Sequence, residues 1–295
     1  MLKPFHLGIN DFGKQKLWQK ALCVLADMQC RTLGPNVISY TAAISACERG
    51  SRWQEALGLA SEMRARTLEP DGKAYAVIIN ACARGAIWRD ALGTLSETRA
   101  CALEPDVITY SAAVSACEKG FAWQDALDLL AAMSLCGAEP DVVAHSAAIS
   151  ACEKGSQCQK ALDIFSSMRH RALAPNLIAY SAAISACEHG TQWDTAVRMI
   201  SEMRRRSLER DAIVFNAAIS ACEKGDQWLH ALGVMCEMRN VEPSLITYNA
   251  AIIACGRCAQ WQRALELFSD LRRRHFEADV VTYNSAVSSF AEGAQ

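Results

Sequence analysis

The chain has 295 residues, of which 51% are hydrophobic, and its formal net charge is −2 at pH 7. Its apolar runs are shorter than the roughly 18 residues that a membrane helix needs. Residues 1–20 have neither the apolar core of a secretory signal nor the Arg- and Ser-rich character of an organellar presequence. Because the chain is nearly neutral, bulk positive charge cannot hold nucleic acid, and any polyanion must be bound by locally arranged cations. We therefore expect a soluble protein without membrane association.

One sequence block recurs along almost the whole chain. At 111–127 it reads SAAVSACEKGFAWQDAL, and close relatives begin at Thr41, Ala76, Ser146, Ser181, Asn216 and Asn249. The period is 35 residues, and no Ser/Gly/Pro-rich linker interrupts it. A period of this length predicts one elongated solenoid, in which each repeat buries its apolar face against its neighbours.

The period also sets the predicted repeat boundaries. If position 1 of the repeat is placed at Val37, the complete repeats are 37–71, 72–106, 107–141, 142–176, 177–211, 212–244 and 245–279. A degenerate repeat over 1–36 precedes them, and a partial repeat over 280–295 follows. The sixth repeat is two residues short near Arg239–Val241.

Each repeat predicts two helices. Positions 4, 8 and 11 (Tyr110, Val114 and Cys117 in the third repeat) have the i, i+4, i+7 spacing of one apolar stripe on a first helix, helix A. A glycine at position 14, such as Gly120, predicts the C-cap of that helix. Positions 17, 20, 21, 24 and 27 then carry the apolar face of a second helix, helix B, as in Trp123, Ala126, Leu127, Leu130 and Met133.

Tryptophan, cysteine and proline each keep to one position of the repeat. All seven tryptophans stand at position 17, which predicts a packing role between helices rather than ligand stacking. Seven of the fourteen cysteines stand at position 11, as expected of small core residues in a reducing compartment. Six of the seven prolines stand at position 34, where they end each repeat.

Positions 2, 5, 9 and 13 lie on a different face of helix A, since they are separated by three, four and four residues. Position 13 carries a cation in every complete repeat: Arg49, Arg84, Lys119, Lys154, His189, Lys224 and Arg257. These cations could simply be solvated and stabilised by the C-terminal end of the helix dipole, each beside a position-12 glutamate such as Glu118. Aliphatic, polar, polar and cationic side chains in one row would also suit a groove that holds a base above its phosphate.

The repeat resembles the pentatricopeptide repeat family in its 35-residue length, its V-x-x-Y opening (Val107–Tyr110), the Ala-Leu pair of helix B and the closing Pro-Asp (Pro140-Asp141). The resemblance implies an all-α, right-handed superhelical solenoid of antiparallel helix-turn-helix repeats. It also implies sequence-specific binding of single-stranded RNA, one base per repeat. Family members of this kind act in mitochondria or chloroplasts in RNA processing, stability, translation or editing, with recruited RNA-processing proteins as possible partners.

The resemblance assigns roles to three sets of positions. Positions 5 and 35 are expected to select the base: Thr41 and Asp71, Ala76 and Asp106, Ser111 and Asp141, Ser146 and Asn176, Ser181 and Asp211, Asn216 and Ser244, and Asn249 and Asp279. Position 2 is expected to wedge between bases: Ile38, Ile108, Val143, Ile178, Ile213 and Ile246. The position-13 cations are expected to contact phosphate. In the second repeat Ala76 cannot hydrogen-bond and Lys73 replaces the aliphatic residue, so no base (N) is assigned there. With the other six pairs, the implied RNA reads G-N-G-A-G-C-U.

Two other interpretations stay open at this stage. The Asp, Asn and Ser residues at position 35 are also good N-caps for the next helix. A protein-binding scaffold is the rival function, because tetratricopeptide repeats are helical hairpins of 34 residues, although their tryptophan lies early in helix A. Cys255-Gly-Arg-Cys258 and His275-Phe-Glu277 resemble part of a zinc-deaminase motif, but in the reverse order. The sequence predicts no catalytic residue, metal, cofactor or small-molecule substrate.

Overall fold

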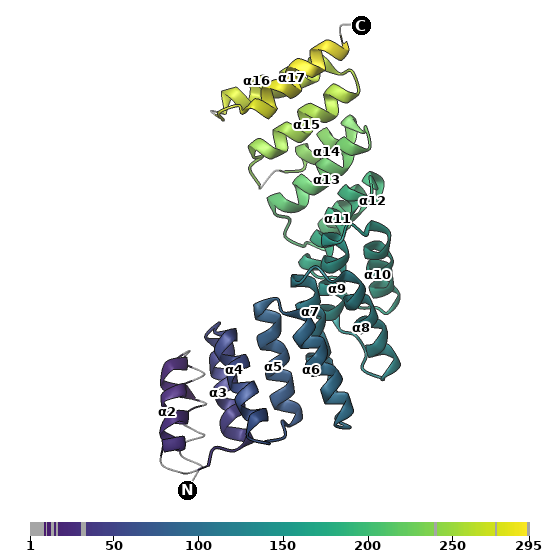
Figure 1. The fold of residues 1–295 in the computed structure, drawn as a ribbon. Helices are drawn as coiled ribbons and strands as arrows, with labels where there is room; N and C mark the ends of the chain where they lie inside the picture. Colours follow the sequence, from purple (N-terminus) through teal and green to yellow (C-terminus); the bar gives the residue numbers. More distant parts are fainter. Residues whose placement is uncertain are drawn as a thin grey trace. The chain divides into compact units, whose positions relative to one another are not determined.

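The computed structural model describes residues 9, 11–12, 15, 17–30, 34–238, 241–274 and 276–293, with side chains up to Ser289. Within these residues the secondary structure consists of α-helices and turns, with no strand. None of the described helices is long and apolar enough to cross a membrane. The expected all-α class is therefore confirmed (Figure 1).

The helices alternate as the repeat predicts. The A helices are α3 (Val37–Arg49), α5 (Gly72–Gly85), α7 (Val107–Lys119), α9 (Val142–Lys154), α11 (Leu177–His189), α13 (Ala212–Lys224), α15 (Leu245–Arg257) and α17 (Val280–Gly293). The B helices are α2 (Trp18–Cys30), α4 (Trp53–Ala65), α6 (Trp88–Ala100), α8 (Trp123–Leu135), α10 (Cys158–His170), α12 (Trp193–Arg205), α14 (Trp228–Cys236) and α16 (Trp261–Arg273). Each A helix begins at position 1 and each complete B helix at position 17.

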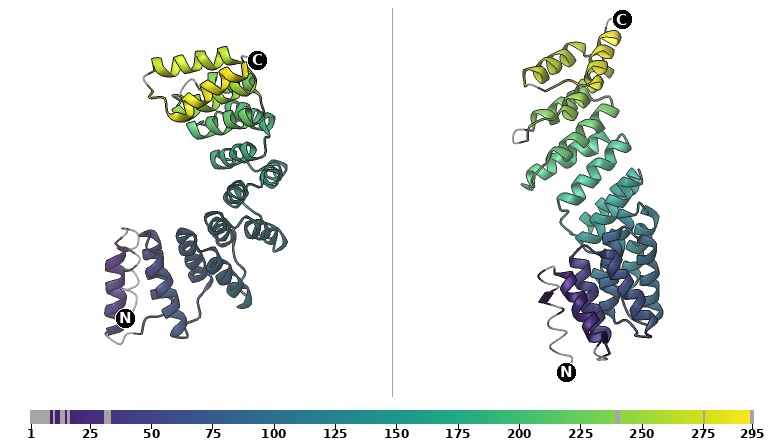
Figure 2. Two further views of the ribbon diagram at one scale, coloured as in Figure 1. Left: turned by 45° about the horizontal axis from the view of Figure 1, so that its top comes forward. Right: turned by 60° about the vertical axis from the view of Figure 1, so that its left-hand side comes forward.

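The chain divides into two compact units, unit 1 over Met1–Ala151 and unit 2 over Cys152–Gln295. Within unit 1, α3 contacts both α4 and α5, and α5 contacts both α6 and α7. Within unit 2, α11 contacts α12 and α13, and α13 contacts α14 and α15. The A helices α3, α5, α11, α13 and α15 thus each pack on their own B helix and on the next A helix, as the two views in Figure 2 show inside each unit.

The apolar stripe at positions 4, 8 and 11 forms the core. Tyr110, Val114 and Cys117 are fully buried, as is each of the other position-11 cysteines. Burial raises the pKa of these thiols, to about 11 at Cys222 and about 12 at Cys117. The thiols are therefore neutral packing groups, as the repeat pattern predicted.

The position-14 glycines such as Gly50 and Gly120 end the A helices as predicted, but not in the left-handed conformation that often favours glycine there. Gly50 and Gly120 have φ angles of −78° and −87°, so neither needs the left-handed conformation of a glycine cap. The left-handed residue is the next one along, for example Ser51 (φ 58°) and Phe121 (φ 58°). Gly50 and Gly120 are the C-caps of α3 and α7, as predicted, and close packing explains why glycine stands there although no left-handed conformation requires it.

The tryptophan of the preceding repeat occupies the space where a Cβ would lie. A Cβ on Gly50 would lie 2.6 Å from Trp18 Cδ1, and one on Gly85 would lie 2.8 Å from Trp53 Cδ2. Both distances are below van der Waals contact, so only glycine lets the ring lie against the end of the next A helix. The predicted packing role of position 17 is confirmed, and its partner is the glycine one repeat later.

The sixth repeat departs from the others in length. Helix α14 has 9 residues, whereas α12 and α16 each have 13. The predicted two-residue gap falls next to this short helix, and Arg239 and Asn240 lie outside the described residues. His275, in the partial deaminase-like motif, also lies outside them.

Candidate nucleic-acid interface

Position 35 of all seven complete repeats caps the A helix that follows it. Asp71 Oδ1 accepts a hydrogen bond from the backbone N–H of Ala74 at 2.8 Å, and Asp106 Oδ1 accepts one from Thr109 at 2.8 Å. Asp141, Asn176, Asp211, Ser244 and Asp279 make the equivalent contact. Capping fixes each side chain at the first turn of an A helix, with part of its hydrogen-bonding capacity already used.

Two of the predicted position-5 and position-35 pairs are in direct contact. Ser111 Oγ donates to Asp141 Oδ1 at 3.1 Å, and Asn249 Nδ2 donates to Asp279 Oδ1 at 3.4 Å. No hydrogen bond joins Thr41 to Asp71, Ser181 to Asp211 or Asn216 to Ser244 among the described residues. Ser146 lies in unit 1 and Asn176 in unit 2.

Other position-5 side chains are held by neighbours. Thr41 Oγ1 donates to the carbonyl oxygen of Val37 at 2.8 Å. Asn216 Oδ1 accepts from Thr247 Oγ1 at 2.6 Å, and Asn249 Oδ1 accepts from Thr282 Oγ1, also at 2.6 Å. These threonines stand at position 3 of the next repeat, so they orient the amide groups of both asparagines in the same way. This second contact was not foreseen, although Thr at position 3 is visible in the sequence.

The position-5 side chains also differ in exposure. Ser111 is 6% exposed and Ser146 is 3% exposed, whereas Thr41, Asn216 and Asn249 are half-buried. Ala76, which has no polar group, is also half-buried. The two buried serines therefore present less of their side chains to a ligand than the asparagines do.

Position 2 forms a row of exposed aliphatic side chains. Ile38, Ile108, Val143, Ile178, Ile213 and Ile246 are between 55 and 67% exposed, on helices whose positions 4 and 8 are buried. Lys73 takes this place in the second repeat and is exposed as well. Exposed large aliphatic side chains at one repeated position indicate a binding surface rather than a contribution to the core.

The position-13 cations are partly paired with acidic residues of the preceding repeat. Arg84 Nε lies 2.5 Å from Glu48 Oε1, and Lys224 Nζ lies 3.0 Å from Glu188 Oε1. Both carboxylates stand at position 12, so the pairs join successive A helices. Lys119 faces a preceding repeat that has Ala83 at position 12, and it makes no ion pair with a described residue. The cations therefore differ in the positive charge that they offer a phosphate.

Sequence models of pentatricopeptide repeats match most of these helices. The PPR repeat family matches residues 35–84 and 243–292, and the pentatricopeptide repeat domain matches residues 128–189 and 198–258. A third, the PPR repeat, matches residues 178–208. The chain belongs to the pentatricopeptide repeat family. No curated protein sequence matches this family member.

Solved structures of the family share the fold of this pentatricopeptide repeat protein. It is 21% identical to the pentatricopeptide repeat protein PPR10 from maize, with a TM-score of 0.55, and the match covers 96% of this chain and 46% of that one. It is 14% identical to the PPR domain of Arabidopsis thaliana protein-only RNase P 1 in complex with tRNA, with a TM-score of 0.54. That match covers 60% of this chain and 95% of the domain. This chain thus spans less than half the length of PPR10.

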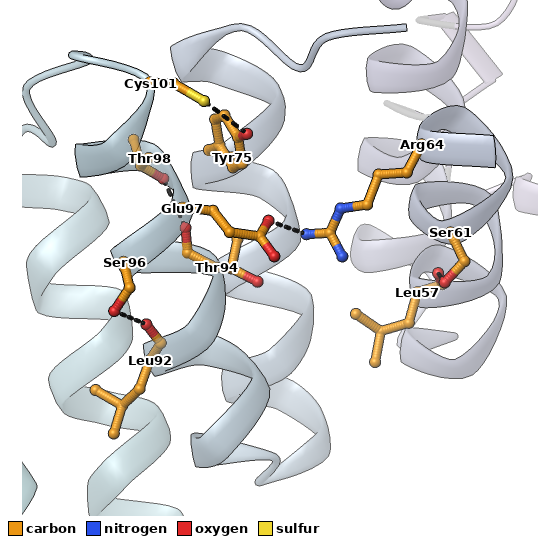
Figure 3. A network of polar contacts seen from close by, with 10 residues as sticks. All are labelled: Leu57, Ser61, Arg64, Tyr75, Leu92, Thr94, Ser96, Glu97, Thr98 and Cys101. Carbon is orange, nitrogen blue, oxygen red and sulfur yellow. Dashed lines mark hydrogen bonds and ion pairs between the residues drawn. The ribbon is translucent and has the colours of Figure 1, made fainter. Parts of the chain in front are cut away.

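A polar network on the B helices of this pentatricopeptide repeat protein was not foreseen. Arg64 Nη2 on α4 donates to Glu97 Oε2 on α6 at 2.7 Å, beside the contact of Tyr75 with Cys101 (Figure 3). Arg169 with Glu202 and Arg204 with Glu237 repeat the same pairing in unit 2, both at 3.5 Å. The signal was present in the sequence as glutamate at position 26 and arginine at position 28.

Within the described part of the chain, the cysteine pair near the seventh A helix belongs to no cluster of metal ligands. Cys255 is fully buried, and burial raises the pKa of its thiol to about 11. Cys258 Sγ donates to the carbonyl oxygen of Asp226 at 3.2 Å. Among the described residues, no group of three or more His, Cys, Asp and Glu side chains is placed to hold a metal ion.

Proposed function

We propose that this pentatricopeptide repeat protein binds single-stranded RNA sequence-specifically, with one base per repeat. The observation that carries the proposal is the row of exposed aliphatic side chains at position 2, next to polar pairs at positions 5 and 35. Ser111 with Asp141 and Asn249 with Asp279 form such pairs between one A helix and the N-cap of the next. Family membership supports the same activity, because the repeats of this family read RNA bases through two or three side chains.

The chemistry of the pairs suits discrimination between bases. Ser111 donates to one carboxylate oxygen of Asp141, and an ionised carboxylate has further lone pairs to accept from a base. The Watson–Crick edge of guanine offers adjacent N–H donors, so an aspartate at position 35 favours guanine when position 5 is Thr or Ser. Asn176 has an amide that both donates and accepts, which fits adenine. These preferences yield the proposed site G-N-G-A-G-C-U.

The position-13 cations would contact the phosphates of the same strand. Lys119 carries an ammonium without a carboxylate partner among the described residues, whereas Glu48 shares the charge of Arg84. We expect Lys119 to contribute more than Arg84 to phosphate binding. Family membership supports the proposal that the protein acts in a mitochondrion or chloroplast, in RNA processing, stability, translation or editing, with recruited proteins performing any chemical step.

A binding titration tests this function. Fluorescently labelled G-N-G-A-G-C-U, with a fixed base at N, and a scrambled heptamer of the same composition are titrated with the protein at two salt concentrations. We expect the designed heptamer to bind at least tenfold more tightly, since each correct contact adds roughly 1–3 kcal/mol of discrimination. Equal and negligible binding of both RNAs would refute RNA binding and favour the protein scaffold.

A further inference from the structure

The residue at position 3 of a repeat varies with the residue at position 5 of the repeat before it. Threonine follows both asparagines at position 5: Thr247 comes after Asn216, and Thr282 comes after Asn249. An apolar residue follows every serine or threonine at position 5: Ala74 after Thr41, Ala144 after Ser111, Ala179 after Ser146 and Val214 after Ser181. The hydroxyl group at position 3 therefore accompanies asparagine and not the smaller polar residues.

Both threonines hold the asparagine through its amide oxygen. Thr247 Oγ1 donates to Asn216 Oδ1 at 2.6 Å, and Thr282 Oγ1 donates to Asn249 Oδ1 at the same distance. Thr247 and Thr282 are fully buried, whereas the two asparagines are half-buried. Each contact thus joins a fixed group inside the stack of helices to a side chain at the surface.

Helix capping does not explain why threonine stands at position 3. The caps formed by Asp71, Asp141 and Asp211 bond to the backbone N–H groups of Ala74, Ala144 and Val214, whose side chains have no hydroxyl. An A helix of this chain therefore begins normally with an apolar residue at position 3. The hydroxyl groups of Thr247 and Thr282 are required for something other than the cap.

The orientation of the Asn249 amide is fixed from two sides. Its Nδ2 donates to Asp279 Oδ1 at 3.4 Å, while its Oδ1 accepts from Thr282. If the amide were turned over, its oxygen would face a carboxylate oxygen, and two acceptors would meet without a proton between them. Asp279 and Thr282 therefore hold the same orientation together.

The Asn216 amide depends on its threonine alone. Position 35 of that repeat is Ser244, and Ser244 has no hydrogen bond to Asn216 among the described residues. The backbone N–H of Ser244 donates to Thr247 Oγ1 at 3.0 Å, which occupies a lone pair of the hydroxyl and leaves its proton for Asn216. Loss of the Thr247 hydroxyl should therefore have the larger effect of the two.

This orientation determines what each asparagine offers to a base. Because Oδ1 already accepts a hydrogen bond, the group left for the base is Nδ2 with its N–H donors. The Watson–Crick edges of cytosine and uracil each have two acceptors, N3 and O2 in cytosine and O4 and O2 in uracil. Those of adenine and guanine have one each, N1 and O6. A side chain that presents donors therefore favours a pyrimidine.

We propose that Thr247 and Thr282 are positioning residues for base selection by the preceding repeat. Each holds an asparagine amide with its N–H donors towards the base, and so favours a pyrimidine at the sixth or seventh position of the RNA. The inference rests on the proposed RNA-binding function and adds a residue of the next repeat to the two that select the base. A buried threonine does not touch the RNA, so it acts through the asparagine.

The test substitutes the threonine that acts alone. Thr247→Val removes the hydroxyl and nearly keeps the shape of the side chain, and Thr247→Ser keeps the hydroxyl. Thr109→Val is the matched control, because Thr109 is also buried at position 3 but follows Ala76, which has no amide to orient. Fluorescence titrations measure binding of G-N-G-A-G-C-U, with a fixed base at N, and of heptamers that carry each other base at the sixth or the seventh position.

We expect the wild type to prefer pyrimidines to purines at both positions. In Thr247→Val the preference at the sixth position should fall roughly three- to tenfold, the worth of one net hydrogen bond, and the preference at the seventh should be unchanged. Thr247→Ser should restore it, and Thr109→Val should change neither preference. Thr282→Val should weaken the preference at the seventh position by only about twofold, because Asp279 still holds the amide.

A gain of function tests the same inference if Thr247→Val does not fold. The fifth repeat has Ser181 at position 5 and Asp211 at position 35, and Val214 follows at position 3. Ser181→Asn alone should shift the fifth base from G towards U. Adding Val214→Thr supplies the missing hydroxyl and should sharpen the preference for U about two- to threefold, as one further hydrogen bond allows.

The outcomes separate the inference from the proposed function. The inference fails if the wild type prefers pyrimidines at the sixth position and Thr247→Val keeps that preference, or if the variant weakens selection at both positions alike. It also fails if Val214→Thr adds nothing to Ser181→Asn. A wild type that binds all the heptamers equally would refute the proposed base reading itself, and the positioning role with it.

Discussion

The two units of the chain are built from the same repeat, but they differ in how regularly a tryptophan packs against a glycine one repeat later. In unit 1, Trp18, Trp53 and Trp88 each lie against a glycine one repeat later. In unit 2, Cys158 replaces the tryptophan beside Gly190, and Cys258 replaces the glycine of the seventh repeat. Unit 2 also has the short helix α14, Arg210 in place of the position-34 proline, and three consecutive arginines at the ends of α12 and α16.

This difference shows which features the fold requires. Both units keep the buried positions 4, 8 and 11 and the capped first turns, so those features are sufficient for helical hairpins to stack. The tryptophan and glycine pair is present at most junctions but is not essential at each one. The departures from the tryptophan and glycine pair fall in unit 2, at Cys158 and Cys258.

The largest expected effect comes from a substitution that disrupts the contact between a tryptophan and a glycine in unit 1. A Cβ at Gly120 would overlap Trp88 Cδ1, so Gly120→Ala should lower the free energy of unfolding by about 3 kcal/mol, at the upper end of overpacking costs. The change is measured by urea unfolding followed by circular dichroism. Hydrogen exchange should locate the loss of protection at α7.

Gly93 provides the matched control, because it lies inside α6 and a Cβ there would meet no atom within 4 Å. Gly93→Ala should stabilise the protein by about 0.5–1 kcal/mol, since alanine is the better helix former. If the two substitutions had the same effect, the tryptophan would not be what requires glycine at position 14.

A second substitution should make unit 2 more like unit 1. Cys158→Trp places an indole ring opposite Gly190, as in the other junctions, and should stabilise unit 2 by about 1–2 kcal/mol through added apolar burial. The measurement is the urea midpoint together with exchange protection of α11. A loss of stability would mean that this junction has closed too far to admit the ring.

The capping role of position 35 can be separated from base selection. Asp71→Ala should cost about 1 kcal/mol because it removes the cap on Ala74, whereas Asp71→Asn should stay within a few tenths. Thermal unfolding compares the two variants. RNA selection then serves as the independent readout, since Asp71→Asn should shift the first base from G towards A. An unchanged preference for the first base would mean that Asp71 caps the helix and does not select the base.

The smallest effects are expected for substitutions of two position-13 cations in unit 1. Lys119→Ala should weaken every RNA severalfold and reduce the salt slope by about 0.7, the value for one phosphate contact on a single strand. Arg84→Ala should change the slope less, because Glu48 already pairs with Arg84. Fluorescence titrations across a salt series measure both slopes, and a larger change at Arg84 would contradict the ion-pair argument.

Much of the fold could be predicted from the sequence because each repeat confirms the others. Helix starts at Val107 and Trp123 follow from the periodic apolar residues and the turn between them. The glycine at position 14 could be predicted as a helix end, but not the packing that requires it, because that depends on a ring one repeat away. Burial of Ser111 and the pairing of Arg84 with Glu48 also depend on stacking between repeats, which sequence spacing alone does not show.

The most direct test of base reading is the substitution Asn249→Thr. It leaves Asp279 in place and gives the seventh repeat the combination of Thr41 and Asp71. Affinities of wild type and variant are measured for heptamers that end in U or in G. We predict that the wild type prefers U and that the variant shifts its preference towards G, by roughly 1–3 kcal/mol in total. An unchanged preference in a variant that still binds the parent RNA would contradict the assignment of positions 5 and 35.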